Sequence, residues 1–169
     1  MLQSEISFLK SVYLFNQLNE DELNKILNIC KKVHYKKGEI IIHEDNPGSS
    51  MYILKDGKVE VCHSLTLKIS KKGFEETEKS MLILDSDDSP FFGDMAILSE
   101  APRSATVKTL SSCTLYKITK NDFNTFCQQY PDVGYKILMP MCKVLCDRVR
   151  KGNEDILKLT TILSIVLTN

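Results

Sequence analysis

The sequence has no excess of either charge, because 22 lysine and arginine residues balance 22 aspartate and glutamate residues. Proteins that bind nucleic acid usually carry a basic excess, which releases counterions from the phosphates. The composition therefore predicts no nucleic-acid partner. Hydrophobic residues make up 43% and charged residues 26% of the 169 residues, which is typical of one globular domain.

The chain also lacks the spacing of a cysteine metal or redox site, a secretory signal and a membrane-spanning run. No two of its six cysteines form a C-x-x-C pair, so we expect reduced thiols that pack in a core. No basic stretch followed by an apolar one opens the sequence. The longest apolar stretch, 156–167, is short and interrupted by polar residues. These absences predict a cytoplasmic protein without membrane insertion.

Residues 1–30 repeat apolar side chains at helical spacing. Within this N-terminal helical segment, Asn19 is the expected N-cap of a helix, because three acidic residues follow it in the first turn. From residue 31 the period changes to the alternation of β-strands. Residues 31–120 contain about eight short strands with turns between them, which predicts a closed β-barrel or jelly roll.

Residues 121–151 return to helical spacing and are expected to form lid helices over the barrel. Pro140 should kink the longer of these helices, and Gly152 with Asn153 should end it. Residues 152–169 would then form an extra apolar helix that packs on its own domain or on a second copy. The predicted fold class is α+β: an eight-stranded antiparallel β-barrel (jelly roll, double-stranded β-helix) flanked by N-terminal and C-terminal helices, all in one domain.

The segment 91–107 interrupts the strand pattern. Gly93 allows the backbone to turn sharply or to approach a ligand closely. Residues 94–98 can form a short helix, and the free amides at a helix start attract anions. Arg103 follows among small residues at the start of a strand. A lone arginine usually lies on the surface. This one lies beside a short helix start and among small residues, where its planar guanidinium could instead bind a phosphate.

The same segment resembles the phosphate-binding cassette of the cyclic-nucleotide-binding domain family. That family includes the regulatory subunits of cAMP-dependent protein kinase, the catabolite activator protein and gated ion channels. Its pattern is F-G-E-[LI]-A-[LI], four variable residues, then P-R-[STA]-A-[TS]-V. The spacing of this pattern is met without a gap by the cassette at 92–107, whose residues at these positions are Phe92, Gly93, Asp94, Met95, Ala96, Ile97, Pro102, Arg103, Ser104, Ala105, Thr106 and Val107. The resemblance covers most of the chain, up to about residue 152.

The resemblance implies a regulatory module that binds cAMP or cGMP, needs no other cofactor and signals by repositioning its C-terminal helices. Backbone amides at about Ala96 and Ile97 would hold the cyclic phosphate, and Arg103 would pair with its exocyclic oxygens. Ser104 would contribute a hydroxyl to the phosphate or the base, which leaves cAMP and cGMP both open. Asp94 would accept a hydrogen bond from the ribose 2′-OH. The residues expected to pack around the base are Val61, Ile69 and Val107.

Two departures from the family pattern matter. Asp94 replaces the usual glutamate, so its carboxylate is one methylene shorter and would reach the ribose through water or a shifted sugar. Asp45 and Asn46 stand where the family usually has Gly-Asp, which bears on the geometry of that turn. We expect nucleotide binding to survive both changes in a weakened form.

Two alternatives remain open. The chain could be an interaction module of the same fold with a lapsed pocket, which dimerises or docks on an effector protein through its C-terminal helices. A transcription regulator of the activator type is less expected, because too few residues follow Gly152 for a helix-turn-helix. An enzyme is the least expected class, since no constellation of nucleophile, acid and base is visible. No metal site is predicted either, because the calcium-loop pattern that begins at Asp85 fails at Pro90 and Ala96.

Overall fold

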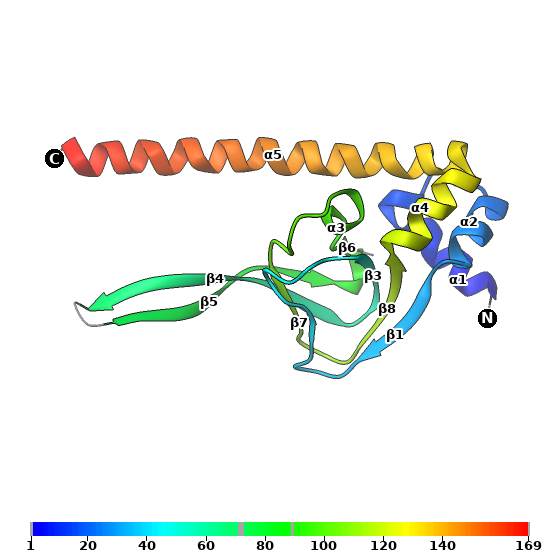
Figure 1. Ribbon diagram of the computed structural model, residues 1–169, viewed down its shortest axis with the longest axis horizontal. Helices are drawn as coiled ribbons and strands as arrows, with labels where there is room; N and C mark the ends of the chain where they lie inside the picture. The colour runs from blue at the N-terminus through cyan, green and yellow to red at the C-terminus, as the bar shows by residue number, and fades with distance from the viewer. Residues whose placement is uncertain (1, 71–72, 89, 169) are drawn as a thin grey trace.

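The computed structural model describes the backbone of residues 2–70, 73–88 and 90–168, and the side chains of residues 2, 65–70 and 73–78 lie outside this description. Helices lie at both ends of the chain and strands in between (Figure 1). In order, the elements are α1 (Leu2–Ser11), η1 (Tyr13–Phe15), α2 (Glu20–Leu27), β1 (Lys31–Tyr35), β2 (Ile40–Ile42), β3 (Ser50–Asp56), β4 (Lys58–Ser70), β5 (Gly73–Asp85), η2 (Ser86–Asp88), β6 (Phe91–Phe92), α3 (Met95–Leu98), β7 (Thr106–Thr109), β8 (Cys113–Thr119), α4 (Lys120–Gln129) and α5 (Pro131–Thr168).

The predicted N-cap of the second helix is confirmed. The Asn19 side chain accepts a hydrogen bond from the Glu22 amide, and the Glu22 carboxylate accepts one from the Asn19 amide, both at 2.9 Å. This reciprocal pair satisfies two amide groups that would otherwise be unpaired at the start of α2. The other carboxylate oxygen of Glu22 receives Lys136 Nζ at 2.6 Å, so the same residue joins α2 to α5.

The described residues form two antiparallel sheets of four strands each, with orders β1-β8-β3-β6 and β2-β7-β4-β5. The α+β class is therefore confirmed, but the prediction of one closed barrel is wrong, because no strand pairing joins the two sheets within the described residues. The edge strands are β1 and β6 of one sheet and β2 and β5 of the other, and within the described residues none of them pairs with a strand of the other sheet. The jelly-roll connectivity stays a prediction.

Sheet β1-β8-β3-β6 has two buried faces, because side chains alternate along its central strands. Met51 and Ile53 of β3 point to a core shared with α1, α2, α4 and the start of α5. Tyr52 and Leu54 point the other way, to a second core between the two sheets. Figure 1 shows the N-terminal helices and α4 gathered at one end of the sheets. One face of this sheet is therefore covered by helices, and the other faces the second sheet.

Helix α5 differs from the prediction in its length. It runs without interruption to Thr168, so the expectation that Gly152 and Asn153 end it, and that 152–169 form a separate helix, is wrong. A glycine inside a helix costs only about 1 kcal/mol relative to alanine, and the residues on both sides keep helical hydrogen bonding. Pro140 lies inside α5 without ending it. None of the described helices has a stretch long and apolar enough to cross a bilayer.

Candidate functional site

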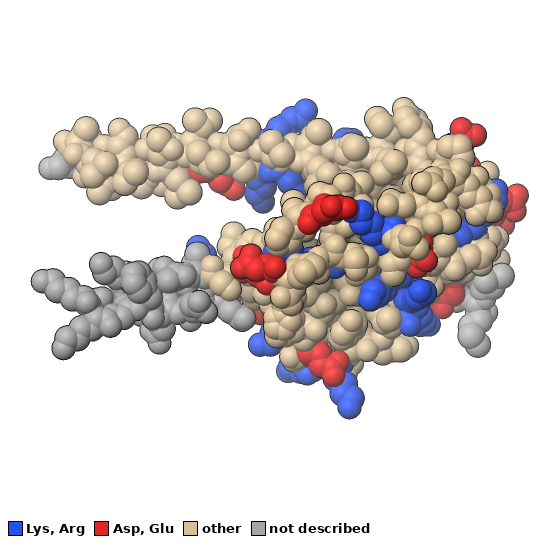
Figure 2. All heavy atoms as spheres, in the orientation of Figure 1, with Lys and Arg blue, Asp and Glu red and all other residues tan. Residues whose placement is uncertain are grey.

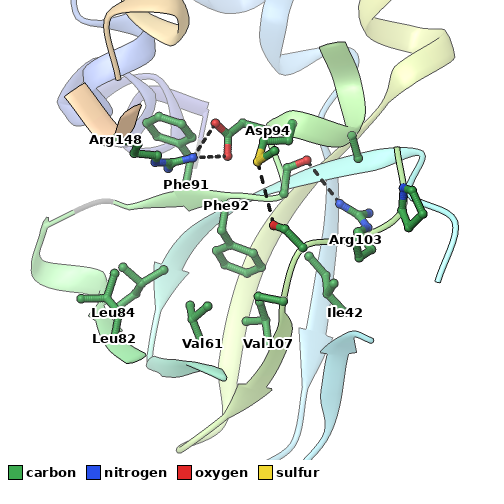
Figure 3. Close-up of a pocket in the computed structure, with 16 residues that line it drawn as sticks. Ile42, Val61, Leu82, Leu84, Phe91, Phe92, Asp94, Arg103, Val107 and Arg148 are labelled. Atoms are coloured by element: carbon green, nitrogen blue, oxygen red, sulfur yellow. Dashed lines mark hydrogen bonds and ion pairs between the residues drawn. The ribbon is translucent and has the colours of Figure 1, made fainter. Parts of the chain in front are cut away.

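A cavity of about 230 Å³ opens beside α3, between the two sheets and the inner side of α5 (Figure 3). The cassette forms much of its wall. The lining residues are Ile42, Val61, Leu82, Leu84, Phe91, Phe92, Gly93, Asp94, Met95, Ala96, Pro102, Arg103, Ser104, Ala105, Val107 and Arg148. The structure therefore brings together most of the residues that the sequence singled out. Ile97 does not line the cavity, because it is buried in the core on the helix side. The side chain of Ile69 lies outside the described residues.

Two glycines allow the backbone to approach Arg103 closely. Gly93 has a positive φ of 74°, and a Cβ there would lie 2.7 Å from Arg103 Nη1. A Cβ on Gly48 would lie 2.7 Å from Arg103 Nε and 2.6 Å from the Cβ of Ala96. Real Cβ atoms do not make contacts this short. Any larger residue at either position would displace the arginine or the helix beside it.

The half-buried guanidinium of Arg103 is held by neutral oxygens only. Its Nη2 donates to the Ser50 carbonyl at 2.8 Å and to the Ser50 hydroxyl at 3.3 Å, while Nη1 donates to the Gly93 carbonyl at 3.3 Å. Burial lowers the pKa of Arg103 from its ordinary value, because it penalises the charged form. No carboxylate among the described residues forms a salt bridge with it. The site therefore holds a positioned cation without a counterion in the part of the chain that the structure describes.

The loop before β3 supports the backbone of Arg103. The Asp45 amide donates to the Arg103 carbonyl, and the Arg103 amide donates to the Asn46 carbonyl, both at 2.9 Å. Asp45 has a positive φ of 64°. This left-handed conformation favours glycine but is accessible to aspartate and asparagine. The departure from the family's Gly-Asp therefore leaves a tight turn in place.

Helix α3 is a single turn, and the amides of Ala96 and Ile97 in it are already paired. The Ala96 amide donates to the Gly93 carbonyl at 3.2 Å, and the Ile97 amide donates to the Asp94 carbonyl at 3.1 Å. The sequence predicted free amide donors at the start of this helix; the amides of Ala96 and Ile97 are paired within the cassette here, and their contact with a phosphate stays a prediction. Both distances lie at the long end of the normal range for an amide hydrogen bond.

The carboxylate of Asp94 is bound by an arginine from α5. Arg148 Nη1 lies 2.9 Å from Asp94 Oδ2 and 3.1 Å from Oδ1 (Figure 3). The Asp94 side chain is 3% exposed, whereas that of Arg148 is 48% exposed. Sequence reasoning missed Arg148, because it lies 54 residues from Asp94 and no motif surrounds it. Its contact joins the C-terminal helix directly to the cassette.

The wall opposite the cassette is apolar. Val61 of β4, Leu82 and Leu84 of β5 and Val107 of β7 face the cavity from one sheet (Figure 3). The sequence predicted Val61 and Val107 but missed the two leucines, although their two-residue spacing on a strand places them on one face. The hydroxyl of Ser104 lies near the cavity mouth, 3.9 Å from the sulfur of Met95. The cavity thus combines a cationic side with an apolar one.

No group of three metal-binding side chains occurs in the described part of the chain.

Comparison with known proteins matches residues 32–130 to the family model described as the cyclic nucleotide-binding domain. The cGMP-dependent protein kinase of Plasmodium berghei is 36% identical over 109 residues, which are 63% of this chain and 11% of the kinase. The chain therefore spans about a tenth of that relative's length. The co-crystal structure of the regulatory domain of Toxoplasma gondii PKA with cAMP has a TM-score of 0.60 and 25% identity, covering 74% of this chain and 44% of that one. The catabolite activator protein of Thermus thermophilus shares the fold, with a TM-score of 0.73 at 21% identity, over 88% of this chain and 63% of that one.

Proposed function

This chain belongs to the cyclic nucleotide-binding domain family, and on that premise we propose that it binds cAMP or cGMP in the cavity beside α3 and acts as a sensor module, not as an enzyme. The observation that carries the proposal is Arg103, a positioned and half-buried cation whose described partners are all neutral. An anion bound in the cavity would supply the missing negative charge. A cyclic phosphate fits this requirement, because it carries one charge and two exocyclic oxygens for the planar fork of an arginine.

The remaining parts of a cyclic nucleotide find matching chemistry around this cation. The apolar wall of Val61, Leu82, Leu84 and Val107 suits the flat face of a purine. Ser104 has an exposed hydroxyl at the cavity mouth, which can serve the phosphate or the amino group of guanine, so both nucleotides remain candidates. The amides of Ala96 and Ile97 would exchange their present carbonyl partners for the phosphate when it enters.

The signal would pass through Asp94 and α5. The ribose 2′-OH needs the Asp94 carboxylate as its acceptor, and Arg148 already holds both oxygens of that carboxylate. A bound nucleotide therefore competes with Arg148 and shifts the population of α5 positions. Because α5 is one continuous helix, a shift of α5 at Arg148 would also move its outer end, where a second copy or an effector protein would bind.

A reducing compartment such as the cytoplasm suits this role. Cys30, Cys113, Cys127, Cys142 and Cys146 are thiols without a disulfide partner. Burial raises the pKa of the Cys30 thiol to about 12, which makes it inert in the core. Cys142 and Cys146 are exposed on α5, so the expectation that the thiols pack in a core is wrong for these two. Unpaired thiols are typical of proteins that are kept reduced.

Titration calorimetry with cAMP and with cGMP tests the proposal. We expect the unmodified protein to bind at least one of them, and Arg103→Ala to bind it at least tenfold more weakly, because each charge-assisted bond contributes about 1.5–3 kcal/mol. Arg150→Ala is the matched control, since Arg150 is exposed and pairs only with Asp147 among the described carboxylates. Equal affinity of the Arg103→Ala protein and the unmodified protein would contradict the proposed phosphate site.

A second candidate function is an interaction module with a lapsed pocket. The internal pairing of Asp94 and of the α3 amides favours it, because the groups expected to bind the ligand are already satisfied within the protein. A thermal-shift measurement separates the two candidates. If neither cyclic nucleotide raises the melting temperature at millimolar concentration, the second candidate replaces the first.

A further inference from the structure

The turn between β2 and β3 contains a residue whose backbone conformation costs free energy. Asp45 has a positive φ of 64°, and every other described residue with a positive φ is a glycine. The left-handed region disfavours residues that have a Cβ, and the family pattern usually has glycine at this position. Strain of this kind persists only where the surrounding structure holds it. A neighbouring group must therefore hold this turn.

Glu44, the residue before Asp45, is bonded on three sides. Its Oε1 lies 3.0 Å from Nδ1 of His63, and its Oε2 accepts a hydrogen bond of 2.8 Å from the Ser64 amide. Its own amide donates to the hydroxyl of the buried Thr106 at 3.1 Å. His63 and Ser64 belong to β4 and Thr106 belongs to β7, so Glu44 ties the turn to two adjacent strands.

The carboxylate of Glu44 is charged in this setting. The hydrogen bond from the Ser64 amide, and next the contact with His63, hold the pKa of Glu44 below its usual value of 4.5. Hydrogen bonds to an ionised acceptor are stronger than those to a neutral one. Charges of both signs are interspersed over the described part of the visible face (Figure 2), so the direct partners of this carboxylate determine its effect.

The turn that Glu44 holds is bonded in both directions to the backbone of Arg103. The Asp45 amide donates to the Arg103 carbonyl, and the Arg103 amide donates to the Asn46 carbonyl, both at 2.9 Å. Pro47 and Pro102 form an isolated antiparallel bridge next to these bonds. The conformation of the turn therefore sets the point from which the Arg103 side chain enters the cavity.

We propose that Glu44 is a positioning residue for Arg103, because it holds Asp45 in the left-handed conformation that places the arginine for an anion. The anchor matters in this chain because aspartate stands where glycine would adopt the same conformation without strain. Glu44 does not line the cavity, so it acts through the turn and not on the ligand. This inference rests on the proposed function in taking Arg103 as the phosphate ligand.

Calorimetry with the cyclic nucleotide that the unmodified protein binds tests this role. Glu44→Ala should bind it about three- to tenfold more weakly, because an aspartate without the anchor leaves the left-handed region. Glu44→Gln keeps an oxygen for the Ser64 amide and should retain the affinity. Asp45→Gly, added to Glu44→Ala, should recover most of the loss, since glycine adopts a positive φ readily. A general loss of stability would not be suppressed at this one position.

Glu39→Ala is the matched control. The Glu39 carboxylate accepts a hydrogen bond of 2.7 Å from the Lys36 amide, in another turn that contains a left-handed residue, Gly38. Glu39 does not line the cavity, and its turn has glycine where the turn after Glu44 has aspartate. The control variant should therefore bind the nucleotide as tightly as the unmodified protein.

Amide hydrogen exchange of the ligand-free protein measures the same role without a nucleotide. The Arg103 amide should exchange about threefold faster or more in Glu44→Ala, at the unmodified rate in Glu39→Ala, and slowly again once Asp45→Gly is added. An unchanged exchange rate in Glu44→Ala overturns the proposal, and so does a double variant that is as impaired as Glu44→Ala. If neither cyclic nucleotide binds the unmodified protein, the proposed function fails, while the exchange rates still decide whether Glu44 positions Arg103.

Discussion

Arg148 and Asp94 join the longest helix of the protein to the cassette through a single guanidinium nitrogen, which donates to both oxygens of a nearly inaccessible carboxylate. The pair satisfies an aspartate that would otherwise be buried without a partner, a situation that proteins avoid because of its desolvation cost. The same pair occupies the group that a ribose would need. Under the proposed function, stability of the ligand-free protein and binding of a ribose would therefore oppose each other at Asp94.

Replacing Arg148 by glutamine should strengthen cyclic-nucleotide binding and weaken the free protein. The variant replaces the charged competitor for Asp94 with a shorter, neutral side chain, and each kcal/mol of lost competition increases affinity about fivefold. The melting temperature should fall, because a buried carboxylate left unpaired costs about 1–3 kcal/mol. Calorimetry and thermal unfolding measure the two effects. Arg150→Gln, two residues away with an exposed partner, should change neither quantity. An Arg148→Gln protein that matches the unmodified protein in both would show that the pair has no role in binding.

The Asp94 side chain should determine how strongly the protein prefers a ribose to a deoxyribose. A hydrogen bond to a carboxylate contributes about 1.5–3 kcal/mol, so cAMP should bind roughly ten to a hundred times more tightly than 2′-deoxy-cAMP. In Asp94→Ala this preference should disappear, whereas Asp94→Glu, with the longer carboxylate of the family pattern, should retain it. Competition calorimetry measures the ratio. A preference that persists in Asp94→Ala would assign the ribose contact to another residue.

Two glycine substitutions should distinguish a loss of cyclic-nucleotide affinity from a loss of folding stability. Gly48→Ala places a Cβ against Arg103 Nε and the Cβ of Ala96, so it should lower cyclic-nucleotide affinity at least tenfold. Gly38→Ala has open space around its Cβ but a positive φ of 85°. It should therefore cost about 1–2 kcal/mol of stability and leave affinity unchanged. Urea denaturation and calorimetry of both proteins test this contrast, and equal affinities would contradict it.

The contact between Glu22 and Lys136 should make stability depend on acid pH. The hydrogen bond from Lys136 is the main reason that the pKa of Glu22 lies below its usual value of 4.5. A carboxyl group with a lowered pKa in the folded state stabilises the fold above its usual pKa, and this contribution is lost as the pH falls through the lowered value.

Glu22→Gln should therefore show a shallower loss of stability on acidification, while it keeps the reciprocal cap with Asn19, since glutamine also serves there. Lys136→Met removes the cation and should flatten the same part of the curve. Urea midpoints measured from neutral pH down to about pH 3 provide the comparison. Parallel curves for all three proteins would show that the Glu22–Lys136 contact contributes nothing.

Sequence reasoning was accurate where the determining interactions are local. The cap at Asn19 depends on residues within one helical turn, and it formed as predicted. It was less accurate at the ends of helices, where small differences in helix propensity compete with the stability of the whole helix. Gly152 has a lower helix propensity than its neighbours, but the cost of one glycine is too small to end a helix of 38 residues. The prediction of a closed barrel was wrong because the alternation of side chains marks a strand but does not show which strands will pair.

The amino-acid sequence alone determined the family, the cassette and the identity of Arg103 as the phosphate candidate, because these depend on residue types at fixed short spacings along one segment. Only the tertiary structure decided that Arg148 binds Asp94 and that Leu82 and Leu84 complete the cavity. Those contacts depend on how α5 and β5 pack against a distant part of the chain. The periodicity of a helix shows which residues share a side but not what that side will meet.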